Sequence, residues 1–173
     1  MAKWIALLRG INVGGGNKVP MADLRALAED LGWSDVATYV ASGNMVFSAK
    51  GDADKLADTL RKALASGLGV DVPILVLPAD RLKADLDACP FEPKEEKHVH
   101  VLFLFDQPHL DNALLADLRT PTEELSVMKQ TAYLHTPDGF GRSKLGEKLG
   151  KVVGCDFTAR NLRTVRTLIE MSG

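Results

Sequence analysis

A run rich in glycine and asparagine is the chain's clearest candidate for chemistry: residues 8–20 read LRGINVGGGNKVP. Glycine adopts positive φ angles without strain and leaves backbone N–H groups uncovered by side chains. Arg9, Asn12 and Lys18 add two cations and an amide to this backbone. The run could therefore bind an anion such as a phosphate beside the helix expected to begin at Pro20. A flexible strand-to-helix connection is the alternative interpretation.

Two familiar phosphate-binding patterns do not fit this run. A P-loop requires GxxxxGK[ST], whereas Lys18 stands between Asn17 and Val19. A dinucleotide-binding loop requires a third glycine at the position that Val19 occupies after Gly14 and Gly16. The run therefore indicates anion binding through backbone amides and Lys18, without naming a reaction.

A second polar turn, Ser42-Gly43-Asn44, lies between two expected strands and is typical of a β-hairpin. Ser42 does not stand in the GxSxG pattern of a nucleophilic serine. The turn could contribute to a binding site only if it lies beside the glycine-rich run at one end of a sheet. The sequence leaves open whether the two segments are close together.

A third candidate is the segment TARN, residues 158–161, which we expect to begin a final helix capped by Thr158. Arg160 and Arg163 would then lie in the first turns, where the helix dipole disfavours a cation by about 0.3–1 kcal/mol. An anion at that helix start, either a ligand or a protein carboxylate, would offset this cost. Residues 142–166 hold seven Lys or Arg against two Asp or Glu, in a chain of net charge −2.

The remaining reactive side chains give no catalytic or metal-binding pattern. Cys89 and Cys155 form no CxxC pair, and His98 and His100 are expected on a solvated strand face without a third ligand. No general base stands out, and we predict neither a metal nor a cofactor. An aromatic content of 6% is low for a base-stacking platform.

The hydrophobic pattern predicts an α+β protein with two similar halves. Residues 3–8, 36–41, 45–47 and 72–77 read as strands, with a helix after Pro20 and another capped by Asp52. This order, βαββαβ, is that of a ferredoxin-like unit.

The second half repeats this order after a helix at 79–88, with strands at 99–105, 125–129 and 131–136 and helices at 110–118 and 143–149. A short strand at 152–157 and the final helix would complete it. We therefore expect an N-terminal ferredoxin-like lobe (1–78), a connecting helix and linker (79–97), and a C-terminal ferredoxin-like lobe with an added C-terminal helix (98–173).

Four segments resemble the bacterial DUF1697 family: LRGINVGG (8–15), NKVPM (17–21), YVASGN (39–44) and TARNLRTV (158–165). Leu162 departs from the pattern, because the family usually carries a tryptophan there. The resemblance implies a two-lobed α+β fold with ferredoxin-like halves. It implies no reaction, since the family is one of unassigned function.

These observations predict a soluble, cytoplasmic binding protein, without a membrane segment, that recognises a phosphate-bearing ligand or nucleic acid through an Arg/Asn/Gly-rich surface. A small enzyme acting on an anionic metabolite is one alternative, and a structural or interaction protein whose motifs serve lobe packing is another. The predicted ligand-binding residues are Arg9, Asn12, Gly14, Gly15, Lys18, Ser42, Asn44, Lys144, Arg160, Asn161 and Arg163.

Overall fold

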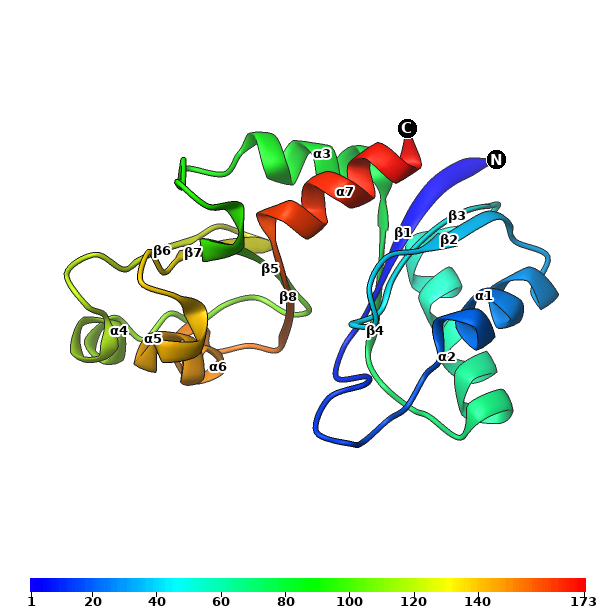
Figure 1. Ribbon diagram of the computed structural model, residues 1–173, viewed down its shortest axis with the longest axis horizontal. Coiled ribbons are helices and arrows are strands. Elements are labelled where there is room, and N and C mark those ends of the chain that lie inside the picture. The colour runs from blue at the N-terminus through cyan, green and yellow to red at the C-terminus, as the bar shows by residue number, and fades with distance from the viewer. The chain divides into compact units, whose positions relative to one another are not determined.

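The computed structural model describes all 173 residues and divides the chain into two compact units. Unit 1 comprises Met1–Ala84 together with Thr167–Gly173, and unit 2 comprises Asp85–Arg166. Each unit contains one four-stranded antiparallel sheet with helices, which confirms the predicted α+β class (Figure 1).

Unit 1 has the ferredoxin-like strand order β2-β3-β1-β4. Helices α1 and α2 lie on one face of its sheet, and the loop after β1 projects from the sheet's end (Figure 1). Its elements are β1 (Ala2–Leu8), α1 (Met21–Asp30), β2 (Ser34–Thr38), β3 (Asn44–Ala49), α2 (Ala53–Leu68) and β4 (Ile74–Pro78).

The core of unit 1 combines alternate residues of a strand with one face of a helix, as the strand and helix periodicities of the sequence predict. Alternate residues of β1, Trp4, Ala6 and Leu8, face the helices and are buried. Leu56, Leu60 and Leu64 present one face of α2 to them at a spacing of four residues.

The boundaries of α2 agree with the capping residues in the sequence. The Asp52 side chain accepts a hydrogen bond of 3.0 Å from the backbone N–H of Lys55, as an N-cap does. The helix ends where Gly69 adopts a left-handed φ of 67°.

Unit 2 repeats the topology with the order β6-β7-β5-β8. Its elements are β5 (Val99–Leu104), α4 (Asn112–Leu118), β6 (Glu124–Val127), β7 (Thr131–His135), α5 (Lys144–Glu147), α6 (Leu149–Val153) and β8 (Phe157–Asn161). Two 3-10 turns, η1 (Glu96–His98) and η2 (Phe140–Arg142), precede β5 and α5. The chain passes between the units within α3 (Ala79–Asp87) and again within α7 (Leu162–Ser172).

The last strand and the last helix differ from the prediction. Residues 149–153 form α6 instead of the expected strand at 152–157, and 157–161 form β8 instead of the first turn of a helix. All five residues of 157–161 pair with β5, from Phe157 opposite Leu104 to Asn161 opposite His100, and this pairing stabilises the strand. Thr158 is therefore a strand residue and caps no helix. None of the helices combines the length and the apolar content needed to cross a bilayer.

Candidate ligand-binding surface

The glycine-rich run contains a hydrogen-bonded hairpin turn. The backbone of residues 12–17 makes two hairpin hydrogen bonds, of 3.1 and 3.2 Å. At its tip Gly14 and Gly15 have φ angles of 63° and 77°. Two consecutive positive φ angles are those of a type I′ turn, which residues with a Cβ adopt only under strain. The tip is exposed to solvent.

Asn12 joins this loop to the turn at 42–44. Its Nδ2 atom donates to the carbonyl oxygens of Val19 at 2.9 Å and Ala41 at 2.7 Å. Its Oδ1 atom accepts from the backbone N–H of Val19 at 2.8 Å. The two segments that the sequence could not place together therefore meet, and the Asn12 amide is the connection.

The turn itself is held by Asn44, which is completely buried. Its Nδ2 atom donates to the Tyr39 carbonyl oxygen at 2.9 Å and to Ser42 Oγ at 3.0 Å. Gly43 has a φ of 96°, and a Cβ there would lie 2.8 Å from Leu8 Cβ. Only glycine lets the turn approach the end of β1 this closely.

An open hollow of about 350 Å³ lies where the loop enters α1. Lys18 is the only charged residue that lines it, and the remaining lining is mostly apolar. Pro20 precedes α1 and provides no side-chain cap, whereas Asp23 places a carboxylate in the first turn of that helix. The lining residues are Asn12, Gly15, Gly16, Lys18, Val19, Pro20, Met21 and Ala41.

Two exposed valines are sequence neighbours of residues that line the hollow, although neither valine lines it. Val13 is 67% exposed and Val40 is 50% exposed, and they adjoin the bonded pair Asn12 and Ala41. Val40 also has a φ of 51°, a left-handed conformation that is a genuine outlier for a β-branched residue. Strain of this kind gathers at functional sites, where the surrounding structure enforces it.

The other predicted residues of unit 1 have mixed environments. Arg9 is half-buried, and its backbone N–H donates to the Pro73 carbonyl oxygen at 3.0 Å. Lys18 and Ser42 are exposed, as are Gly14 and Gly15 at the hairpin tip. Asn12 and Asn44 serve the scaffold through the hydrogen bonds described above.

Arg160 does not lie at a helix N-terminus, so the dipole argument for an anion beside it is wrong. It is a β8 residue opposite Val101 and is only 8% exposed. Its Nη1 atom donates to Thr158 Oγ1 and to the Ala159 carbonyl oxygen, both at 2.8 Å. Burial lowers the pKa of its guanidinium to about 10.

The residue that caps α7 is Asn161. Its Oδ1 atom accepts from the backbone N–H of Thr164 at 2.9 Å. Arg163 is the second residue of α7 and is exposed, so its predicted position in the first turn is confirmed.

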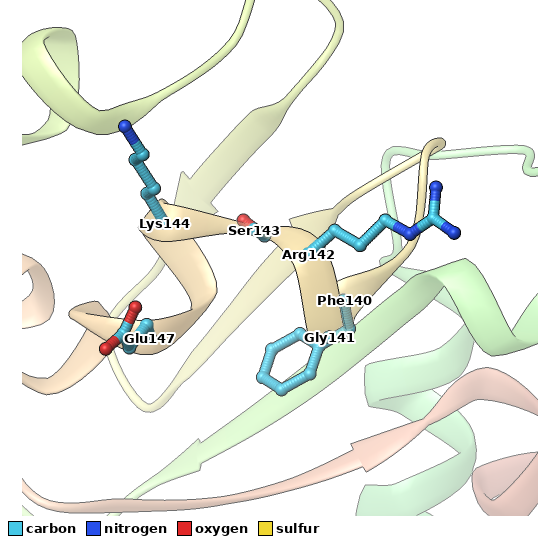
Figure 2. Close-up of a pocket in the computed structure, with 6 residues that line it drawn as sticks. All are labelled: Phe140, Gly141, Arg142, Ser143, Lys144 and Glu147. Carbon is cyan, nitrogen blue, oxygen red and sulfur yellow. The ribbon is translucent and has the colours of Figure 1, made fainter.

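Lys144 lines a separate pocket of about 300 Å³ in unit 2. The Arg142 and Lys144 side chains point in different directions, and the Glu147 carboxylate shares the pocket (Figure 2). Ser143 Oγ accepts from the Gly146 N–H at 2.9 Å and thereby caps α5. The two cations therefore do not converge on one anion.

His100 is a feature that the sequence interpretation missed. It shares the core-facing side of β5 with Leu102 and Leu104, and its ring lies 4.4 Å from that of Phe140 between centroids. Its Nδ1 atom is buried and makes no hydrogen bond. Burial and, to a lesser degree, the neighbouring His98 lower the pKa of His100 to about 4.

The expected solvated strand face is therefore wrong for His100. His98 precedes the strand, in η1, with Nε2 3.5 Å from Glu95 Oε2. The signal that could have indicated burial was the run of residues 99–104, which is apolar at every position except His100 and is therefore typical of a strand buried on both faces.

The fold and the site together define a two-unit α+β protein with ferredoxin-like sheets and an open hollow on its first unit. The chain belongs to the DUF1697 family, described as proteins of unknown function, whose family model matches residues 1–133. That match contains the whole glycine-rich loop and the turn at 42–44, while the resembling segment 158–165 lies beyond it.

The chain is also similar to a solved structure, that of the conserved bacterial protein SP0830 from Streptococcus pneumoniae. The two share 26% sequence identity with a TM-score of 0.78, and the similarity covers 99% of each chain. No curated protein sequence matches this chain.

Proposed function

We propose that the protein is a binding protein and that unit 1 recognises a phosphate-bearing ligand, a nucleotide or a strand of nucleic acid. The observation that carries this proposal is the open hollow whose only charged lining residue is Lys18. The hollow borders the start of α1, where backbone N–H groups have no side-chain cap.

The electrostatics of this corner favour an anion. The uncapped start of a helix of ten residues carries a partial positive charge, and an anion there gains about 0.3–1 kcal/mol. The Lys18 ammonium adds a full charge on a flexible stem that reaches a phosphate oxygen. The Asp23 carboxylate lies in the first turn of α1 and repels an anion there, so it opposes the contributions of the helix and of Lys18. Removing that carboxylate should therefore strengthen phosphate binding.

The bonded residues around the hollow act as scaffold rather than as ligand contacts. Asn12 commits its whole side-chain amide to the loop and the turn, and Asn44 is buried. Lys18, Gly14 and Gly15 are left exposed to meet a ligand. Lys18 is also the only titratable side chain lining the hollow, which favours binding over acid–base catalysis.

The test is fluorescence anisotropy with short labelled RNA and single-stranded DNA at about 50 and 200 mM salt. We expect binding that weakens at the higher salt, with each neutralised phosphate adding about 0.7 to the log–log slope for a single strand. Lys18→Ala should reduce that slope by about one such contact. Asp23→Asn should tighten binding.

Lys50→Ala is the matched control, because it removes the same charge from an exposed lysine. Lys50 follows the end of β3 that pairs with Ala2, at the opposite end of the sheet from the loop after Leu8. Equal effects of Lys18→Ala and Lys50→Ala would reduce the binding to general electrostatics and refute the site. An absence of binding at both salt concentrations would refute the proposed function.

A further inference from the structure

We infer that unit 2 has its own binding site for a single strand of nucleic acid. In this site the Phe140 ring stacks on an unpaired base, while Arg142 and Lys144 contact the phosphates on either side of that base. The site is separate from the hollow of unit 1, and it gives a role to Lys144, which the proposed function leaves unused.

The first support is the exposure of the Phe140 ring. Phe140 is 37% exposed, whereas every other Phe, Trp and Tyr side chain of the protein is buried or half-buried. The ring also lines the open pocket of about 300 Å³ in unit 2. Every base has a flat π-face, so a surface aromatic ring can stack on a base of any sequence.

The second support is that the ring is held in place before a ligand arrives. The His100 ring packs against Phe140 with 4.4 Å between centroids and an angle of 34° between the ring planes. A Cβ at Gly146 would lie only 3.0 Å from Phe140 Cε2, so the ring also packs on the backbone of α5. Stacking on a ring that is already ordered costs little side-chain entropy.

The third support is the placement of the two cations. Arg142 and Lys144 are exposed and line the same pocket as Phe140, yet their side chains point in different directions (Figure 2). They therefore fit a ligand that carries an anionic group on each side of a flat ring. An internal nucleotide of a single strand has this form, whereas a mononucleotide carries phosphate at one position only. A duplex does not fit, because its bases are paired and their faces are inaccessible.

The other polar side chains of the pocket limit the strength of binding. Ser143 is buried, and its Oγ atom already accepts the Gly146 N–H, so it belongs to the scaffold. The exposed Glu147 carboxylate repels phosphate and leaves the lining with one net positive charge. Glu147→Gln should therefore strengthen the binding of a single strand.

The experiment measures fluorescence anisotropy with three labelled DNAs of about 12 nucleotides: an oligothymidylate, an abasic strand of the same length, and a duplex. At about 50 mM salt, we expect the oligothymidylate to bind at least about fivefold more tightly than the abasic strand, the lower end of what one stacked base provides. The ratio of these two affinities is the readout for unit 2. The Lys18 contact of unit 1 does not affect this ratio, because both strands carry phosphate.

Phe140→Leu removes the ring but keeps an apolar side chain, and it should reduce the ratio to about one. Its affinity for the duplex should stay unchanged, which shows that the variant is folded. Phe140→Tyr keeps the ring and should keep the ratio.

The cations are tested by the salt dependence of oligothymidylate binding between about 50 and 200 mM salt. Arg142→Ala and Lys144→Ala should each lower the log–log slope by about 0.7, the value of one phosphate contact on a single strand. Lys151→Ala is the matched control and should not lower it, because Lys151 is an exposed lysine of α6 that lies outside the pocket.

Four results would overturn the inference. An unchanged ratio in Phe140→Leu would show that the ring stacks on no base, and it would leave phosphate binding by unit 1 intact. Equal slopes for Lys144→Ala and Lys151→Ala would reduce the role of the cations to general electrostatics. Competition by thymidine monophosphate as effective as that by unlabelled oligothymidylate, at equal nucleotide concentration, would assign the site to a free nucleotide instead. No binding of any DNA would refute both this inference and the proposed function.

Discussion

His100 makes the stability of this protein depend on pH in a defined window. The imidazole is partly buried against the Phe140 ring, and its Nδ1 atom is buried without a hydrogen bond, so the folded protein resists protonation of His100. An unfolded chain protonates the same residue with an ordinary pKa of 6.5, whereas folding lowers that pKa to about 4. The folded state therefore binds fewer protons than the unfolded state between these two values.

The sign and the magnitude follow from this difference. Because the unfolded state takes up the proton first, the free energy of unfolding falls as the pH falls from 6.5 to about 4. At 1.36 kcal/mol for each pH unit, the loss attributable to His100 is about 3 kcal/mol. The contribution of neutral His100 to the free energy of unfolding is fully present above pH 6.5, and it does not change further below about pH 4.

The assay is urea unfolding followed by circular dichroism, at several pH values between about 7.5 and 4. Carboxylates also contribute to acid unfolding, so the comparison is between the wild type and His100→Leu. The leucine is apolar like its face neighbours Leu102 and Leu104 and cannot titrate. The variant should lose about 3 kcal/mol less than the wild type across this range.

His109→Leu is the matched control, since it makes the same substitution at an exposed histidine. This variant keeps His100 and should therefore retain the loss of stability attributed to that residue. If His100→Leu also follows the wild type, the argument that burial suppresses protonation of His100 is refuted. His98→Gln provides a further check, because His98 lowers the pKa of His100 and its removal should shrink the effect.

Three substitutions test the scaffold of the hollow and of the last helix by thermal and chemical unfolding. Asn12→Ala removes two hydrogen bonds to Val19 within the loop and one from the loop to Ala41 beside the turn, and it should lower the free energy of unfolding by about 1–3 kcal/mol. An unchanged value would show that these bonds do not hold the segments together. Gly43→Ala should destabilise by at least about 1–3 kcal/mol, because its Cβ would lie 2.8 Å from Leu8 Cβ at a positive φ, and a wild-type melting temperature would contradict this. Asn161→Ala should lower the free energy of unfolding by about 1 kcal/mol through loss of the α7 cap. An equal loss in Thr158→Ala, with Asn161→Ala unchanged, would instead identify Thr158 as the capping residue.

Much of the fold could be predicted because its signals are local. The helix α2 carries its cap, its apolar stripe and its terminating glycine within its own residues 52–69. The order of strands and helices in unit 1 likewise follows from alternating and helical periodicity. The ferredoxin-like strand order then follows from that element order and is confirmed in both units.

The candidate site was predictable only in part. Glycine, asparagine and lysine at 10–18 indicated a loop with exposed backbone, and the structure contains an ordered hairpin there. The bond between Asn12 and Ala41 spans 29 residues and left no local signal. The strain at Val40 is equally invisible in the sequence, because it arises from the closure of the turn by Asn44.

The sequence by itself determined the α+β class, the two ferredoxin-like repeats and the family, since capping and periodicity act over a few residues. Only the tertiary structure decided the conformation of residues 157–161 and the environment of His100. Thr158 has a helix-capping side chain, yet pairing with β5 along five residues outweighs that local preference and buries Arg160. Burial of His100 depends in the same way on Phe140, which lies 40 residues further along the chain.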